Sequence, residues 1–134
     1  SAELVMQNIL LDTHALLWFD QEPERFSPRV KKALRSKSAT IFVSPVSLYE
    51  LQRKLEIGKL PQAARLLENI DRRMVDYDFR FLPITARHAI VAARLNWDHR
   101  DPFDRLLVAQ ATEESCAIVS ADQRFSQAGI QVMW

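Results

Sequence analysis

The residues of this sequence that could do chemistry together are acidic. Asp12 and Asp122 each follow a short apolar run, Glu50 lies in a segment with helical periodicity, and Asp104 lies in the segment HRDPFDRLLVAQA, which starts at His99. Clustered carboxylates repel one another and raise one another's pKa unless a cation lies between them. If the fold brings these four acids together, we therefore expect a metal site.

The donor atoms narrow the choice of metal. Oxygen ligands suit Mg²⁺ or Mn²⁺, whereas Zn²⁺ favours histidine and cysteine spacings that this sequence lacks. A hard ion held by carboxylates lowers the pKa of a bound water and neutralises charge that develops on a phosphate. Phosphodiester hydrolysis is therefore the predicted reaction. We assign His14, His88 and His99 no catalytic role, because a histidine beside an apolar helix more often packs or caps.

Each acid also has an ordinary structural explanation. Asp12 and Asp122 suit turn positions, Glu50 suits an ion pair with Lys54 four residues on, and Asp104 suits the first turn of a helix. Taken singly, these explanations are the better ones. Taken together, they require several independent acids to fall at one edge of a sheet, the edge where open parallel sheets bind their ligands.

The segment that contains Asp104 predicts a buried helix with an acidic start. Asp101 suits the N-cap and Pro102 the first helical position, where no amide hydrogen is needed. The residues from Leu106 to Ala111 are too apolar for a surface helix. We therefore expect this helix to pack into the core and to hold Asp104 at its edge.

The elements that must position the acids alternate between strand and helix. Apolar and β-branched runs predict strands over residues 8–11, 40–43, 79–84, 117–119 and 130–134. Helical spacing and start signals predict helices over residues 13–19, 28–34, 45–58, 61–77, 86–95 and 102–111, with one further turn over 123–127. This alternation predicts an α/β fold whose parallel sheet has helices on both faces. If the first, second and fourth strands are neighbours, the four acids and Ser120 share one crevice.

Composition sets the broad class. With 134 residues, 48% hydrophobic and 26% charged, we expect one soluble domain over residues 1–134, with residues 1–5 left over from expression. A formal net charge of +1 gives no overall attraction to nucleic acid, so an RNA partner needs a local basic patch.

No apolar run reaches the roughly 20 residues that span a bilayer, which predicts a cytoplasmic protein. The lone Cys116 excludes a disulfide framework and suits the core.

Four separated segments resemble one known family. LLDTHALLW, SLYELQRKLEIGKL, HRDPFDRLLVAQA and IVSADQRF are similar in type and spacing to motifs of the PIN-domain ribonucleases of the VapC toxin type. The resemblance covers nearly the whole chain. It implies a three-layer α/β/α PIN-like fold with a parallel sheet of about five strands and Mg²⁺- or Mn²⁺-dependent endoribonuclease activity on RNA. It also implies a cognate antitoxin as inhibitor, and a homodimer or toxin–antitoxin hetero-oligomer.

The resemblance also implies roles for individual residues. It gives the catalytic and metal-binding role to four acids: Asp12, Glu50, Asp104 and Asp122. It places three residues beside them, where they contact substrate, water or the ligands: Asp101, Ser120 and Lys54. The residues LQRK that end at this lysine depart from the commoner aliphatic pattern and leave the ligand set intact.

Two other protein classes that place acids at a sheet edge do not fit this sequence, and a third possibility does. A haloacid-dehalogenase-type phosphatase needs a second aspartate two residues after Asp12, where this sequence has His14. A phosphoacceptor receiver domain needs an aspartate at the end of its third strand, where this sequence has Ile84 and Thr85. A catalytically inactive PIN-like module, whose acids hold a partner or a structural cation, stays open as the alternative function.

Overall fold

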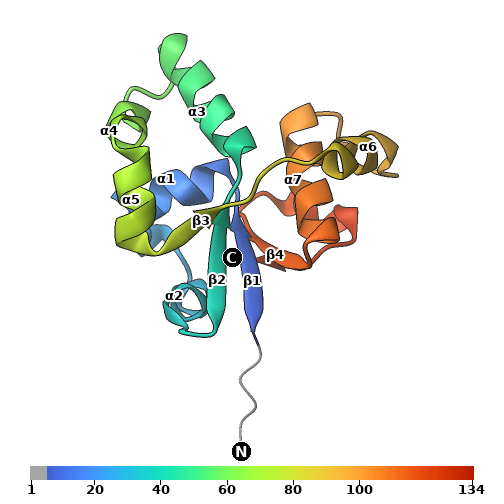
Figure 1. Cartoon of the computed structure of the whole chain (residues 1–134), viewed down its shortest axis with the longest axis horizontal. Coiled ribbons are helices and arrows are strands. Elements are labelled where there is room, and N and C mark those ends of the chain that lie inside the picture. Colours follow the sequence, from blue (N-terminus) through green and yellow to red (C-terminus); the bar gives the residue numbers. More distant parts are fainter. Residues whose placement is uncertain (1–5) are drawn as a thin grey trace, which may run out of the picture.

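A five-stranded parallel sheet organises the computed structural model, which describes residues 6–134 (Figure 1). The strands are β1 (Gln7–Leu11), β2 (Ala39–Val43), β3 (Phe79–Phe81), β4 (Cys116–Val119) and β5 (Val132–Met133), in the order β3-β2-β1-β4-β5. This confirms the predicted parallel sheet, and it meets the condition for a shared crevice, since the first, second and fourth strands are neighbours. The expectation about residues 1–5 lies outside the described part of the chain.

Helices cover both faces of the sheet, as the three-layer prediction requires. The helices are α1 (Thr13–Gln21), α2 (Pro28–Arg35), α3 (Pro45–Glu56), α4 (Ala63–Glu68), α5 (Ile70–Tyr77), α6 (Ala86–Arg94) and α7 (Pro102–Glu113), with 3₁₀ turns η1 (Pro23–Arg25) and η2 (Gln123–Ala128). Helices α1, α2, α4 and α5 lie on one side of the sheet, α6 and α7 on the other, and α3 extends beyond the end of β2 (Figure 1). Within residues 6–134, every helix is too short or too polar to cross a bilayer.

Alternation along β1 builds the two cores. Ile9 and Leu11 pack in the cluster under α1, α4 and α5, while Leu10 packs in the cluster that includes Leu107 and Val108 of α7. Five consecutive residues of α7, from Leu107 to Ala111, are buried, which confirms the predicted buried helix. Successive residues of β1 therefore point to opposite helical layers. Packing on both faces fixes the position of the strand and of its carboxyl end.

Side-chain caps start the helices that surround the carboxyl ends of the central strands. Asp12 caps α1, Ser44 caps α3, Asp101 caps α7 and Asp122 caps η2, each accepting a hydrogen bond from a backbone amide two or three residues on. Helix α3 stops before Gly58, whose φ of 77° suits the left-handed turn after a helix. The helix starts around the sheet edge are thus fixed by polar side chains.

Three predicted boundaries are wrong. Residues 61–77 form two helices, α4 and α5, because the backbone of Asn69 leaves the helical region at φ −125° and ψ 31°. The third strand ends at Phe81, since Leu82 donates the last ladder bond to Val43 O and Pro83 has no amide hydrogen. The fifth strand shortens to residues 132–133.

Candidate metal site

The carboxyl ends of the three central strands lie at one height. Leu11 of β1 pairs with Val43 of β2 and with Val119 of β4, so the residues that follow these three leave the sheet together. The amide of Asp12 also donates to Val119 O at 3.1 Å. This edge is the switch point of the sheet, because β1 has β2 on one side and β4 on the other.

All four predicted acids line one pocket of about 190 Å³ at this edge. The pocket is lined by these acids and by six further residues: Thr13, His14, Lys54, Asp101, Arg124 and Phe125. Two of the three residues placed beside the acids, Asp101 and Lys54, are therefore part of it. Ser120 is buried beneath the pocket and accepts a hydrogen bond from the amide of Asp122 at 2.9 Å.

Asp12 is the most deeply buried of the acids, with 8% of its surface exposed. Its Oδ1 accepts from the amide of Ala15 at 2.8 Å. Burial raises the pKa of Asp12 to about 6, against the lowering effect of hydrogen bonds from Ser120 and Ala15, and the nearby Asp104 raises it further. Asp12 therefore gains or loses its proton near neutral pH.

Asp104 projects from the first turn of α7 toward His99. The Nε2 atom of His99 lies 2.5 Å from Asp104 Oδ2, and the two side chains are 14% and 17% exposed. Burial raises the pKa of Asp104, and the charges of Asp101 and Glu50 add to this, while the bond from His99 opposes it. Potential ligand atoms of His99, Asp101 and Asp104 lie within 4.8 Å of one another.

Glu50 is oriented from two sides. Thr13 Oγ1 donates to Glu50 Oε1 at 2.7 Å and lies 3.2 Å from Ser47 Oγ. Lys54 Nζ lies 3.0 Å from Glu50 Oε2, which is the ion pair that the four-residue spacing predicts. Glu50 therefore forms the ion pair with Lys54 that an ordinary structural role predicts, and the same carboxylate also lines the pocket.

Asp122 is held by a guanidinium. Arg124 Nε donates to both carboxylate oxygens of Asp122, at 3.0 and 3.2 Å, and Nη2 donates to Oδ2 at 2.7 Å. These bonds hold the pKa of Asp122 below its usual range. Arg124 Nη1 also lies 3.3 Å from His99 Nδ1, so this arginine contacts both Asp122 and the histidine that bonds Asp104.

The donor set fits a hard divalent cation. Four carboxylates from different elements face one small space, and two of them have a raised pKa, which is the electrostatic cost that a bound cation would remove. Carboxylate oxygens are the ligands that Mg²⁺ and Mn²⁺ favour. The residues that line the pocket therefore fit such an ion.

Sequence reasoning gave no site role to several residues that contact the acids, among them Thr13, His99 and Arg124. Thr13 directly follows Asp12, and Arg124 lies two residues after Asp122, a spacing that suits an arginine folding back on a capping acid. From the sequence, we assign His99 no catalytic role, yet its imidazole bonds Asp104, five residues on. His88, by contrast, caps α6, accepting from the amide of Thr85 at 3.0 Å.

Known proteins share this sequence pattern and this fold. Residues 9–131 match the model of the PIN domain family. Ribonuclease VapC22 of Mycobacterium tuberculosis is 29% identical over 120 residues, which cover 89% of this chain and 90% of that protein.

Solved structures agree with the same fold. VapBC2 from Rickettsia felis, bound to a DNA fragment from its promoter, superposes with a TM-score of 0.68 at 14% identity over 96% of this chain and 98% of that one. VapC20 of Mycobacterium tuberculosis, a toxin that cleaves the sarcin-ricin loop, superposes with a TM-score of 0.63 at 20% identity over 91% and 95% of the two chains. With the family match over residues 9–131, this chain belongs to the PIN-domain family.

Proposed function

We propose that this chain is a Mg²⁺- or Mn²⁺-dependent endoribonuclease of the VapC type, the toxin of a toxin–antitoxin pair. The observation that carries the proposal is that four acids, two of them in α3 and α7 and two at the caps of α1 and η2, line one pocket at the switch point of a PIN-domain sheet. The similarity to ribonuclease VapC22 over 89% of the chain supports RNA as the substrate.

Asp12, Glu50, Asp104 and Asp122 are the proposed ligands. When bound, a divalent ion supplies charge neutralisation at the scissile phosphate and acidifies a water molecule. Because four carboxylates around a phosphodiester would otherwise repel it, the acids can serve hydrolysis only in company with a cation. Asp12, with its pKa of about 6, is the acid whose proton this environment holds most strongly.

The neighbouring residues orient the ligands. Thr13 and Lys54 each fix one oxygen of Glu50, and His99 fixes Asp104. Ser120 fixes the backbone of Asp122, so its proposed role is to support the ligands from below. Partners that hold a ligand carboxylate in place are expected to matter for metal affinity.

The proposed partners are RNA and a cognate antitoxin, in a homodimer or a toxin–antitoxin hetero-oligomer. Structures of similar fold support this, since they include VapBC2 from Rickettsia felis and FitAcB from Neisseria gonorrhoeae, the latter with a TM-score of 0.64 at 21% identity over 94% of this chain and 96% of that one. An antitoxin that inserts an arginine among the acids would silence the site, because a guanidinium pairs with carboxylates.

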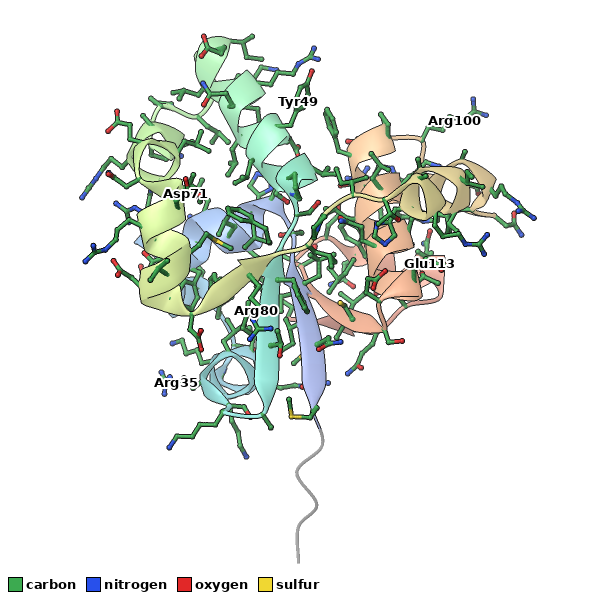
Figure 2. The ribbon with its side chains drawn as sticks, in the orientation of Figure 1. Arg35, Tyr49, Asp71, Arg80, Arg100 and Glu113 are labelled. Carbon is green, nitrogen blue, oxygen red and sulfur yellow. The ribbon has the colours of Figure 1, made fainter. Side chains whose placement is uncertain are left out.

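The test is RNA cleavage with Mg²⁺, with Mn²⁺ and with chelator. Wild type is expected to cleave only with metal, and Asp12→Asn and Glu50→Gln are expected to fold and to lose cleavage. Asp71→Asn, at an exposed acid of α5 away from the pocket (Figure 2), is the matched control and is expected to cleave like wild type. Metal binding without any cleavage would favour the inactive binding module, and wild-type cleavage by Asp12→Asn would remove the metal-site assignment.

A further inference from the structure

A second hollow opens beside the metal pocket, between α3 and α7. It has a volume of about 460 Å³ and shares three residues with the pocket: Glu50, Lys54 and Asp101. Its remaining lining comes from the end of α3 and the start of α7: Arg53, Ile57, Lys59, Pro102 and Phe103. We call this hollow the α3–α7 groove. A chain that lies in the groove therefore reaches the metal pocket without crossing a barrier of other residues.

Three cations and two acids line the α3–α7 groove, whereas acids outnumber cations in the pocket. Arg53, Lys54 and Lys59 fall within seven residues and all line the groove. Arg53 and Lys59 are exposed, and neither forms an ion pair within residues 6–134. Since the chain as a whole carries a net charge of only +1, this is the kind of local basic patch that a polyanion requires.

One exposed aromatic ring, that of Tyr49, packs against the partly buried Phe103 of the groove. Tyr49 of α3 is 58% exposed and its ring packs against that of Phe103, with centroids 5.4 Å apart. Tyr49 projects from α3 on the side of α7 (Figure 2). Ile57, two turns further along the same helix, is 57% exposed. Aromatic rings beside cations are the combination that binds single-stranded nucleic acid, because bases stack on the rings while cations follow the backbone.

We propose that the α3–α7 groove binds the single-stranded RNA that flanks the scissile phosphate. Arg53 and Lys59 contact phosphates, and Tyr49, supported by Phe103, stacks on a base. The proposal rests on the proposed ribonuclease function, since RNA is the polyanion that the site would cleave. RNA fits better than a protein partner, because two unpaired cations adjoin the very pocket that must receive a phosphate.

The electrostatic part is tested by RNA binding in chelator, where cleavage does not interfere. Anisotropy of a fluorescent single-stranded RNA is measured against salt concentration for wild type and for the double variant Arg53→Gln/Lys59→Gln. Each lost phosphate contact lowers the slope of log K against log salt by about 0.7, so a loss of about 1.4 is expected. Arg35→Gln, at an exposed arginine of α2 near the opposite end of the sheet (Figure 2), is the matched control and keeps the wild-type slope.

The stacking part is tested by Tyr49→Ala and Tyr49→Phe. The alanine variant is expected to weaken RNA binding roughly 5- to 150-fold, and the phenylalanine variant is expected to bind like wild type, since it keeps the ring. Circular dichroism and melting curves verify that each variant folds. Light scattering is recorded on the same samples, and a change of oligomeric state with unchanged RNA affinity overturns the proposal in favour of an interface between copies.

Two results separate this proposal from the ribonuclease proposal. If wild type cleaves RNA with metal but the double variant keeps the wild-type salt slope, the groove assignment is wrong and the function stands. If wild type binds RNA through these residues but cleaves none with any metal, the groove assignment stands and the enzymatic function is wrong. Absence of RNA binding by wild type in chelator at low salt overturns the groove assignment.

Discussion

Replacing Asp12 by asparagine gives a quantitative test of the site's electrostatics. The amide keeps the shape of the side chain and an oxygen that can accept from the amide of Ala15, so the cap of α1 is retained. It removes the negative charge, which at 8% exposure is expensive to hold. Asp12→Asn is therefore expected to stabilise the protein at neutral pH while it removes a proposed ligand.

The sign and size follow from proton linkage. The pKa of Asp12 rises from 3.8 to about 6 on folding, so between these values the folded protein binds more protons than the unfolded chain. Stability therefore falls as the pH rises through this window, and the fall is complete above pH 6. A pKa that rises by about two pH units on folding corresponds to a change of roughly 3 kcal/mol in the free energy of unfolding.

The assay is urea unfolding of wild type and Asp12→Asn in chelator, at intervals from pH 4 to pH 8. The variant is expected to gain roughly 3 kcal/mol over wild type at pH 7.5, and the gain is expected to vanish toward pH 4. Comparing the two proteins cancels the titration of groups that both contain. A constant difference across this range would refute the reasoning, because it would mean that Asp12 titrates alike in the folded and unfolded states.

Three further predictions concern the same site. In Mg²⁺ at ten times its dissociation constant, wild type is expected to gain about 1.4 kcal/mol, a melting shift of a few degrees, and Asp104→Asn is expected to lose most of it; a full shift would exclude Asp104 as a ligand. Arg124→Gln is expected to bind Mn²⁺ several-fold more tightly by calorimetry, since a competitor for Asp122 is gone; weaker binding would make Arg124 a supporting group. Arg105→Ala is expected to lower the unfolding free energy by roughly 2–4 kcal/mol, because its guanidinium donates to four carbonyl groups between Ala92 and His99; an unchanged urea midpoint would contradict this.

Much of the fold could be predicted because its signals are local. Ser44 and Asp101 are each followed by proline, and both start a helix as the pattern indicates. The apolar runs of β1, β2 and β4 are continuous because these strands are covered on both faces. The break at Asn69 could not be predicted in the same way, because the apolar spacing continues across it from α4 into α5, and both helices pack in one core cluster.

The candidate site was predictable in its acids and less so in their partners. The strand order brings Asp12 beside the residues that follow β2 and β4, whereas the alternation along the sequence predicts a parallel sheet without fixing which strands are neighbours. The position of His99 depends on a loop of irregular backbone, which Arg105 holds through its bonds to the carbonyl groups of that loop. The hydropathy pattern does not predict the contact of His99 with Asp104, because this contact depends on the path of the loop and on the guanidinium of Arg105.

The four acids are not equivalent, and their differences indicate how a cation would bind. Asp122 is paired with Arg124, Glu50 with Lys54, and Asp104 with His99, while the buried Asp12 has only neutral donors. A cation that binds here would therefore compete with Arg124 for Asp122 and with a proton for Asp12. Proton competition for Asp12 would weaken binding of the proposed metal below a pH of about 6. Above that pH, the ion pairs of Asp122 with Arg124 and of Glu50 with Lys54 would oppose binding instead.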